Sequence, residues 1–322
     1  MIMQTAQKHS SNLTGDPTVV DLHELISLSR FAQHFQLPIN AIKSQYKGSM
    51  LSAFKGRGME LADIRRYEEG DDVRDINWMA LARTGEVHTN LYQEERERPL
   101  FLWIDQSQSM QFATQGLYKS VVASKLAALV GWHELQKHNR VGGFSVTDTK
   151  VAHFNAARSR KGFIQLLGQL SQVKNQPQSK QQPLTFLQKL QSLSQMKHPG
   201  VALYIFSDFR GWDDECKKFL LRLSRHQDIL LTLILDPVEI HLPSHGRYAI
   251  SNREKQININ TANKKVMGKY YKAVSDRINA VMDMAKYPGI NCTQVLTTDE
   301  PIVATYRALN EYRDEFKVGE FV

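Results

Sequence analysis

The sequence predicts an α/β fold with a doubly wound, mostly parallel sheet. From Leu100 onward, short runs of nearly continuous apolar residues alternate with longer segments that have helical spacing. Strands that are apolar throughout are buried on both faces, as a parallel sheet covered by helices requires. The 322 residues are 42% hydrophobic and 23% charged, which is enough apolar material for a sizeable core and argues against general disorder.

Three parts of the chain differ in character. Residues 1–20 are polar and are predicted to be a disordered N-terminus. Residues 21–99 are predicted to form an N-terminal accessory module, which begins with a helix capped by Asp21 and continues with short, β-rich, turn-rich pieces. Residues 100–322 are predicted to form the α/β domain, with a β-hairpin insertion near 245–262.

Within the α/β domain each element follows from its residue pattern. Apolar runs predict strands at 100–104, 140–146, 150–154, 201–208, 229–236 and 290–297. Helical spacing predicts helices at about 118–137, 161–173, 184–193, 215–225, 267–286 and 301–312. The polar segment before 184, rich in Gln and Pro, is predicted to be a loop.

The composition narrows the class of protein. Cys216 and Cys292 lie far apart, so neither a disulfide framework nor a thiolate zinc site is expected. The first residues lack the apolar core of a signal peptide, and no apolar run approaches the roughly 20 residues that cross a bilayer. We therefore expect a cytoplasmic protein.

The net charge of +8 comes from 41 basic and 33 acidic residues that are interleaved along the chain. This pattern favours a solvated basic surface and no nucleic-acid partner. A local group of Arg158, Arg160 and Lys161 keeps a weak nucleic-acid binder as an alternative.

Polar residues follow two of the predicted strands. Asp105, Ser107 and Ser109 come after the first strand of the α/β domain, and Asp208 comes after 201–208. Ligands of open α/β sheets bind at the carboxyl ends of the strands, and residues two apart in an extended turn point the same way. A carboxylate with hydroxyls suits Mg²⁺ or Mn²⁺. The alternative is that Asp105 caps the helix that follows.

The Asp-x-Ser-x-Ser loop with a later aspartate resembles the metal-ion-dependent adhesion site, or MIDAS, of von Willebrand factor A domains. That family adds a threonine, and Thr185 stands at the matching place, although Thr147 and Thr149 are nearby competitors. An ordinary helix N-cap is the alternative for Thr185. The resemblance implies metal ligation by the serines and the threonine, aspartates that act through water, and a coordination position completed by an acidic residue of a partner.

The segment 56–87 resembles the signature of the bacterial domain-of-unknown-function family 58. The matching residues are Gly56, Gly58, Glu60, Arg66, Tyr67, Gly70, Asp71, Arg74, Ile76, Trp78, Ala82, Arg83 and Thr84. Asn77 stands where that family often has Asp. The resemblance implies a von Willebrand A, Rossmann-like domain associated with MoxR-type AAA+ ATPases.

The expected function is that of a non-enzymatic, metal-dependent adaptor for protein–protein interaction, a co-chaperone or assembly partner of a MoxR-type AAA+ ATPase. The alternative is a magnesium-dependent phosphatase like the haloacid dehalogenases, with Asp105 as nucleophile and Asp213 and Asp214 near a metal. That chemistry needs an acid two residues after the nucleophile, where this chain has Ser107.

Overall fold

The computed structural model describes residues 16–32, 59–68, 70–94, 99–173, 182–196, 200–242, 247–252, 255–260 and 264–310. The chain divides into two compact units, Gln45–Glu97 and the combination of Met1–Ser44 with Arg98–Val322. The sequence analysis placed the described residues 21–32 in the accessory module, whereas this division groups them with the α/β unit. Residues 1–15 of the predicted disordered N-terminus lie outside the described residues.

The larger unit contains a six-stranded sheet in the order β10-β7-β6-β3-β4-β5. Its strands are β3 (Leu100–Asp105), β4 (Val141–Val146), β5 (Val151–Ala157), β6 (Ala202–Ser207), β7 (Asp228–Leu235) and β10 (Ile290–Leu296). All neighbours are parallel except β5, which runs antiparallel to β4. The predicted mostly parallel sheet is confirmed, and its order, 3-2-1-4-5-6 along the chain, is compatible with a doubly wound α/β fold.

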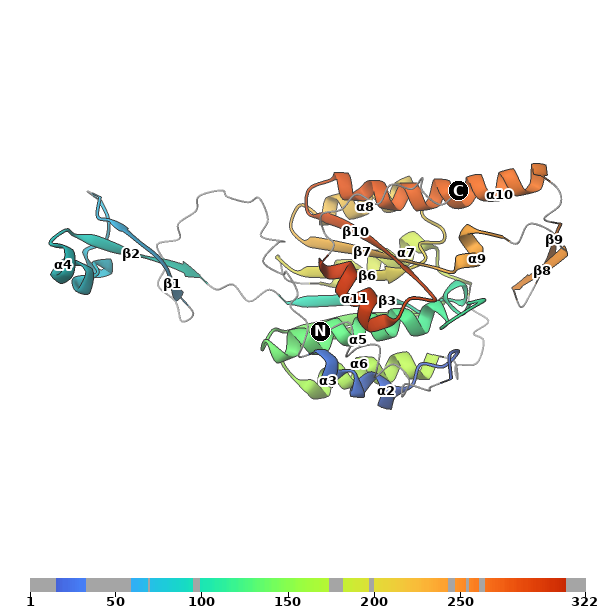
Figure 1. Ribbon diagram of the computed structural model, residues 1–322, viewed down its shortest axis with the longest axis horizontal. Helices are drawn as coiled ribbons and strands as arrows, with labels where there is room; N and C mark the ends of the chain where they lie inside the picture. The colour runs from blue at the N-terminus through green and yellow to red at the C-terminus, as the bar shows by residue number, and fades with distance from the viewer. Residues whose placement is uncertain are drawn as a thin grey trace. The chain divides into compact units, whose positions relative to one another are not determined.

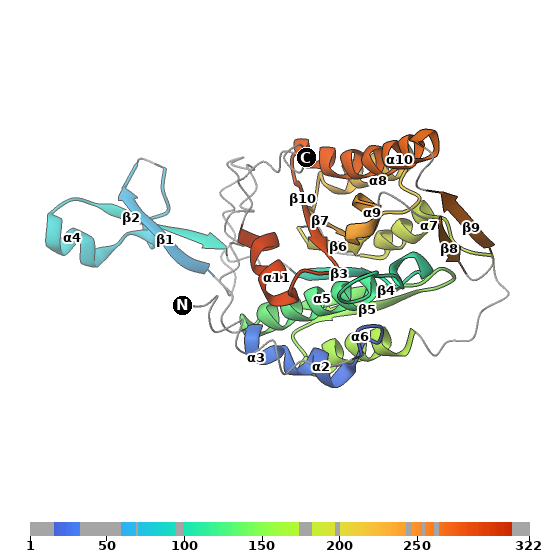
Figure 2. The same ribbon diagram turned by 45° about the vertical axis from the view of Figure 1, so that its right-hand side comes forward.

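Helices cover both faces of this sheet (Figures 1 and 2). One face packs against α5 (Lys119–Gln136), α6 (Arg160–Gln172) and α11 (Pro301–Asn310), and the other against α7 (Phe186–Gln191), α8 (Asp214–Leu223) and α10 (Lys264–Met282). Nearly all of α5 is buried, because the sheet covers one side and other helices cover the rest. At Gly131 a Cβ would meet the ring of Phe163, so the missing side chain lets α5 and α6 approach closely.

Two short N-terminal helices complete this layer. Helices α2 (Leu22–Ser27) and α3 (Ser29–Ala32) bury Leu25, Leu28 and Ala32 in the same apolar core as α5. Asp21 caps α2, as predicted, by accepting a hydrogen bond from the Glu24 amide. The amphipathic pattern therefore reflects packing against the α/β unit.

The remaining elements of this unit are short. They are η4 (Gln108–Met110), η6 (Ser192–Gln195), α9 (Pro237–Ile240), η7 (Asp283–Lys286) and the antiparallel pair β8 (Arg247–Asn252) and β9 (Lys255–Asn260), which falls where the sequence predicts a hairpin. Within the described residues, the helices lack the combination of length and apolarity that spanning a bilayer requires.

The smaller unit pairs β1 (Met59–Arg66) antiparallel with β2 (His88–Glu94) and adds η3 (Val73–Asp75) and α4 (Trp78–Thr84). Asn77 is the N-cap of α4, and its side-chain oxygen accepts from the Ala80 amide at 2.9 Å. Asp and Asn are equally good caps, so the departure from the family pattern at this position retains the local structure. The helix ends at Gly85, whose φ of 74° favours glycine.

Candidate metal centre

The two predicted aspartates lie at the carboxyl edge of neighbouring strands. β3 ends at Asp105 and β6 at Ser207, and these strands are paired in parallel. The chain passes from β3 to β4 on one side and later reaches β6 on the other, so this is the switch point where open α/β sheets bind ligands. The Ser207 hydroxyl donates to Asp105 Oδ2 at 2.6 Å, which ties the two strand ends together.

The loop after β3 places two neighbouring hydroxyls beside Asp208, one of which contacts it. Asp105 Oδ1 accepts from the Ser107 amide at 2.9 Å, a local turn that bends the chain back. Ser107 precedes η4, but its hydroxyl is not used as a cap. Ser107 Oγ lies 3.3 Å from Ser109 Oγ, which donates to Asp208 Oδ1 at 3.1 Å. The structure thus brings four of the five predicted site residues together.

Asp208 is paired with a lysine that the sequence analysis missed. Lys119, the first residue of α5, is fully buried, and its Nζ lies 2.8 Å from Asp208 Oδ2 and 3.2 Å from both carboxylate oxygens of Glu239. Burial alone would raise the pKa of Asp208, but Lys119 and Arg210 hold it below its usual value. The available signal was a lysine next to the mostly apolar stretch 121–132, shortly after the loop 105–109.

Asp105 has the opposite electrostatic environment. It is buried, and this burial raises the pKa of its carboxyl group, with nearby Asp208 adding to the effect. Lys189 of α7 partly opposes the increase. The site therefore contains one carboxylate that is neutralised by an ammonium group and one that would be stabilised by additional positive charge.

Thr185 serves as the N-cap of α7. Its hydroxyl accepts from the Gln188 amide at 3.2 Å, and the Gln188 side chain accepts from the Thr185 amide in return. This is the alternative role considered for it, and the second lone pair of the oxygen is compatible with a further ligand. Thr147, its competitor, bonds instead to the Lys150 carbonyl within the β4–β5 turn.

Asp148 connects the metal-type loop, residues 105–109, with helix α7. The sequence analysis did not single out this aspartate. One of its carboxylate oxygens accepts from the Gln108 amide at 2.7 Å, and the other accepts from Lys189 Nζ at 2.9 Å. Its carbonyl accepts from the Leu184 amide at 2.7 Å, next to Thr185. One aspartate thus fixes the two predicted ligand segments relative to each other.

The backbone directly after Asp208 is strained. Phe209 has a φ of 51°, a left-handed conformation that is uncommon for a bulky residue, and its side chain is fully buried. Its amide donates to Ser207 Oγ at 3.0 Å, and the Arg210 amide donates to Asp208 Oδ1 at 3.2 Å. Strain of this kind concentrates at functional sites, where the surrounding packing holds it in place.

The donor set fits a small, hard cation. Ligands at 2.0–2.1 Å in adjacent positions of an octahedral Mg²⁺ lie about 3 Å apart. The spacings of 3.3 Å between the two serine oxygens and 3.1 Å from Ser109 to Asp208 are close to this value. The described part of the chain has no group of three or more His, Cys, Asp or Glu arranged to hold a metal, so hydroxyl oxygens are essential to this set.

The residues invoked by the phosphatase alternative have a structural role here. Asp213 accepts from the Cys216 amide at 2.8 Å and is the N-cap of α8, in which Asp214 is the first residue. A carboxylate at a helix N-terminus is stabilised by the amide groups that it accepts from and by the helix dipole.

Comparison with known proteins identifies relatives whose roles are unknown. The family described as "Protein of unknown function DUF58" matches residues 63–279. Uncharacterised proteins of Mycobacterium tuberculosis and Mycobacterium bovis are 26% identical over 214 residues. The match spans 65% of this chain and 65% of each relative, less than two thirds of the relatives' own length.

Two solved structures are also similar to parts of the chain. One is the conserved hypothetical protein BatB from Bacteroides thetaiotaomicron, with 12% identity and a TM-score of 0.38. The other is an aerotolerance-related membrane protein from Bacteroides fragilis, with 15% identity and a TM-score of 0.38. Each match covers 67% of this chain and 98% of that structure.

Proposed function

Because this chain belongs to the family of unknown function DUF58, whose match covers more than half of its length, we propose that its α/β unit is a von Willebrand factor A-like docking domain. In this proposal the domain binds Mg²⁺ or Mn²⁺ and uses it to recognise an acidic residue of a partner protein. The observation that carries the proposal is the row of oxygens from Ser107, Ser109 and Asp208 at the switch point of the sheet.

Hydrogen bonds and an ion pair within the chain position the proposed ligands in the absence of a cation. Asp105 holds the turn that positions Ser107, and Ser109 already contacts Asp208. Lys119 keeps Asp208 ionised within a buried environment, so that its free lone pairs remain available. When bound, the cation supplies a strong positive charge with an open coordination position, which a carboxylate fills.

The rim of the site adds a second attraction for an acidic partner. The Arg210 side chain is 53% exposed, and its guanidinium lies 2.7 Å from Glu239 and 3.4 Å from Asp208. A guanidinium at the entrance attracts a carboxylate and is suited to bidentate contact with it. Together with the cation, this predicts a preference for Asp or Glu at the docking position.

We further propose that the partner is a MoxR-type AAA+ ATPase, which the chain serves as a non-enzymatic co-chaperone or assembly factor. This part of the proposal rests on the family resemblance of the segment 56–87, and the docking chemistry above is consistent with it.

The test measures binding of the purified, nucleotide-free MoxR-type ATPase of the same organism to the full chain, in Mg²⁺ and in EDTA. Omission of nucleotide ensures that chelation acts on this chain and not on the ATPase. Loss of one charge-assisted contact corresponds to about 1.5–3 kcal/mol, so EDTA should weaken binding by about tenfold or more.

The substitutions should remove ligands without disturbing the buried ion pair. The double variant Ser107→Ala, Ser109→Ala removes two proposed ligands and should weaken binding as EDTA does. Ser224→Ala, at the end of α8, removes a hydroxyl that donates to the Leu221 carbonyl, away from the metal centre, and this variant should bind like the wild type. Binding that is unchanged both in EDTA and in the double variant would refute metal-dependent docking.

A further inference from the structure

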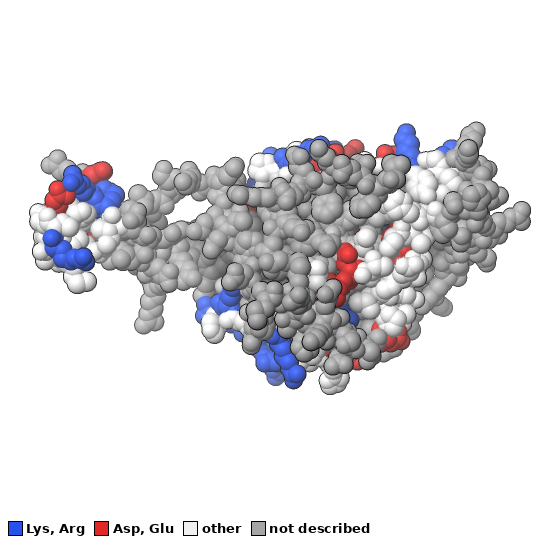
Figure 3. Space-filling view, viewed as in Figure 1, with Lys and Arg blue, Asp and Glu red and all other residues white. Residues whose placement is uncertain are grey.

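A hollow of about 300 Å³ lies on the α/β unit. Its described lining comes from α3, the last turns of α5 and the segment that leads into α6: Ser29, Arg30, Trp132, Leu135, Gln136, Arg158 and Arg160. Of the described residues that line it, three are arginines and none is acidic. The sequence analysis singled out Arg158 and Arg160, but the docking function proposed above does not use them. Figure 3 shows Lys and Arg side chains gathered near the N-terminal end of α6.

This hollow is separate from the candidate metal centre. Helix α5 begins with Lys119 in the metal centre and has Trp132 and Gln136 in its last turns. At 1.5 Å per residue its 18 residues span about 27 Å. The two sites therefore lie at opposite ends of one helix.

Specific contacts hold the walls of the hollow together. The buried ammonium of Lys125 lies 2.6 Å from the Glu24 carboxylate, which anchors α2 to α5. Trp132 Nε1 donates to the Leu25 carbonyl at 2.9 Å, and Gln136 Nε2 donates to the Ser29 carbonyl at 2.9 Å. These contacts hold α2 and the start of α3, which carries Arg30, against α5.

One of the arginines is also oriented. The Arg160 guanidinium lies over the Trp132 ring, 5.0 Å from its centroid, and that ring packs edge-on against Phe163 at 4.9 Å. A guanidinium stacked on an aromatic face keeps its N–H groups directed outward in its own plane. Less side-chain entropy is lost on binding, because this orientation exists before a ligand arrives.

The described carboxylates of α2 and α5 each contact a side chain outside this hollow. Glu24 forms an ion pair with Lys125, and the Glu134 carboxylate accepts a hydrogen bond from the Asn139 side chain at 2.7 Å. Arg30 and Arg160 thus bring two positive charges to a hollow whose described lining contains no carboxylate. Such an arrangement favours a compact ligand with several oxygens and more than one negative charge.

We propose that this hollow binds a phosphomonoester group. A phosphomonoester has a charge between −1.5 and −2 at pH 7 and three strong acceptor oxygens, which match several arginines better than the single charge of a carboxylate does. The group could belong to a small phosphorylated molecule or to a phosphorylated Ser or Thr of a protein, since both present the same chemistry. A nucleic acid, by contrast, requires basic residues along an extended path, whereas these arginines line a single small hollow.

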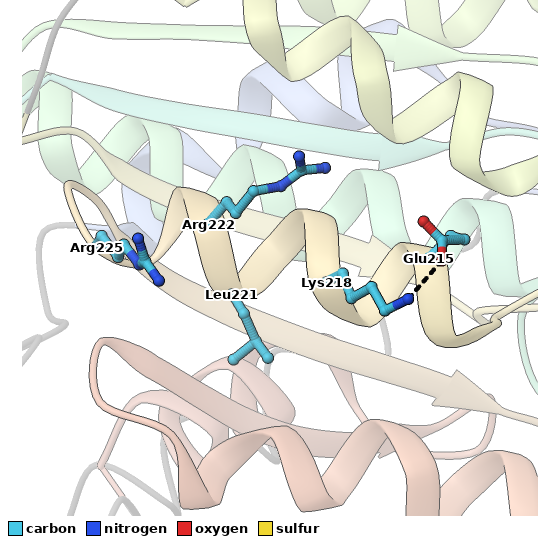
Figure 4. A pocket seen from close by; sticks show the side chains of 5 residues that line it. All are labelled: Glu215, Lys218, Leu221, Arg222 and Arg225. Atoms are coloured by element: carbon cyan, nitrogen blue, oxygen red, sulfur yellow. Dashed lines mark hydrogen bonds and ion pairs between the residues drawn. The ribbon is translucent and has the colours of Figure 1, made fainter.

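A basic hollow on α8 offers a matched control. It is lined by Glu215, Lys218, Leu221, Arg222 and Arg225, but there Glu215 forms an ion pair with Lys218 at 2.8 Å (Figure 4). Because this hollow has a carboxylate among its walls, it should bind the phosphomonoester weakly. The variant Arg222→Gln removes one positive charge, as Arg160→Gln does, and leaves the hollow next to α3 unchanged.

The experiment titrates the full chain with free O-phosphoserine, with a phosphoserine peptide and with the same peptide unphosphorylated, by calorimetry at constant ionic strength. The proposal predicts binding of at least one phosphorylated probe, weakened about tenfold or more in Arg160→Gln and unchanged in Arg222→Gln. Thermal unfolding verifies that both variants are folded, and Arg30→Gln is a second variant of the same hollow.

The pattern of binding identifies the source of the phosphate. Binding of both probes, or of O-phosphoserine alone, supports a small phosphorylated ligand, and binding of the peptide alone supports a phosphoprotein. The proposal would be overturned if neither probe bound, or if Arg160→Gln and Arg30→Gln both bound like the wild type. Tighter binding of single-stranded DNA than of either probe would also overturn it.

Discussion

The substitution Lys119→Met tests the electrostatic balance of the metal centre. Methionine is similar in length to lysine but is uncharged, so the change removes the ammonium that lies 2.8 Å from Asp208 and 3.2 Å from Glu239. All three side chains are at most 5% exposed. Removal of one partner from a buried ion pair leaves an uncompensated charge and costs about 3–5 kcal/mol.

This loss sets the expected magnitude. For a unit of this size, 1 kcal/mol corresponds to roughly 2–4 °C in melting temperature, so a loss of about 3 kcal/mol lowers it by roughly 6–12 °C. Mg²⁺ should then restore part of the stability, because a cation held by Ser109 and Asp208 supplies the missing positive charge. At ten times its dissociation constant the ion adds about 1.4 kcal/mol, or roughly 3–6 °C.

The assay compares thermal unfolding with and without Mg²⁺ in the wild type, in Lys119→Met and in Lys125→Met. Lys125 is a matched control, since it is also a buried lysine of α5 but pairs with Glu24. Both variants should be destabilised, and only Lys119→Met should gain more from Mg²⁺ than the wild type does. Equal Mg²⁺ responses in all three proteins would refute the reasoning.

Three further predictions concern single side chains. Burial raises the pKa of Cys216 and Cys292 to about 12, so about one thiol in ten thousand is ionised at pH 8. Both thiols should react with a disulfide reagent only after the chain unfolds. Rapid reaction of the native chain would contradict this prediction. Thr185→Ala removes the cap of α7 and should lower the free energy of unfolding, measured in urea, by about 1 kcal/mol; Thr185→Ser should retain it. Burial lowers the pKa of His133, whose buried Nε2 has no hydrogen-bond partner among the described residues. Its contribution to stability is therefore present above pH 6.5 and is lost as the pH falls toward the folded-state pKa. His133→Gln should therefore flatten the pH dependence of stability below pH 6.5, with the contribution of Glu134 common to both proteins; an unchanged slope would contradict the assignment.

The sequence predicts the α/β core well because its signals are local. An apolar run such as Asp228–Leu235 is buried on both faces in the structure, as its composition requires. The antiparallel direction of β5 was not predicted, although its cause is local: residues 147–150 are too few for the crossover that parallel strands need. The packing of α2 against α5 depends on residues about a hundred positions apart, so its amphipathic pattern did not identify the surface that it covers.

The same contrast between local signals and long-range contacts decides which residues of the candidate site could be predicted. Asp105 and Asp208 could be predicted because the ends of parallel strands meet at one edge of a sheet. The ion pair between Lys119 and Glu239 could not, because it joins residues 120 positions apart and Glu239 lies within the short helix α9. Asp148 lies in a short turn, and its link to the metal-type loop requires the paired strands β3 and β4 to bring the two loops together.

The most direct measurement of the metal centre is anomalous diffraction from crystals of the chain grown with Mn²⁺. The account predicts one strong anomalous peak about 2.1–2.2 Å from Ser107 Oγ and Ser109 Oγ, next to Asp208, that is absent in the Ser107→Ala, Ser109→Ala double variant. Crystals with millimolar Mn²⁺ and no peak at these oxygens would contradict it.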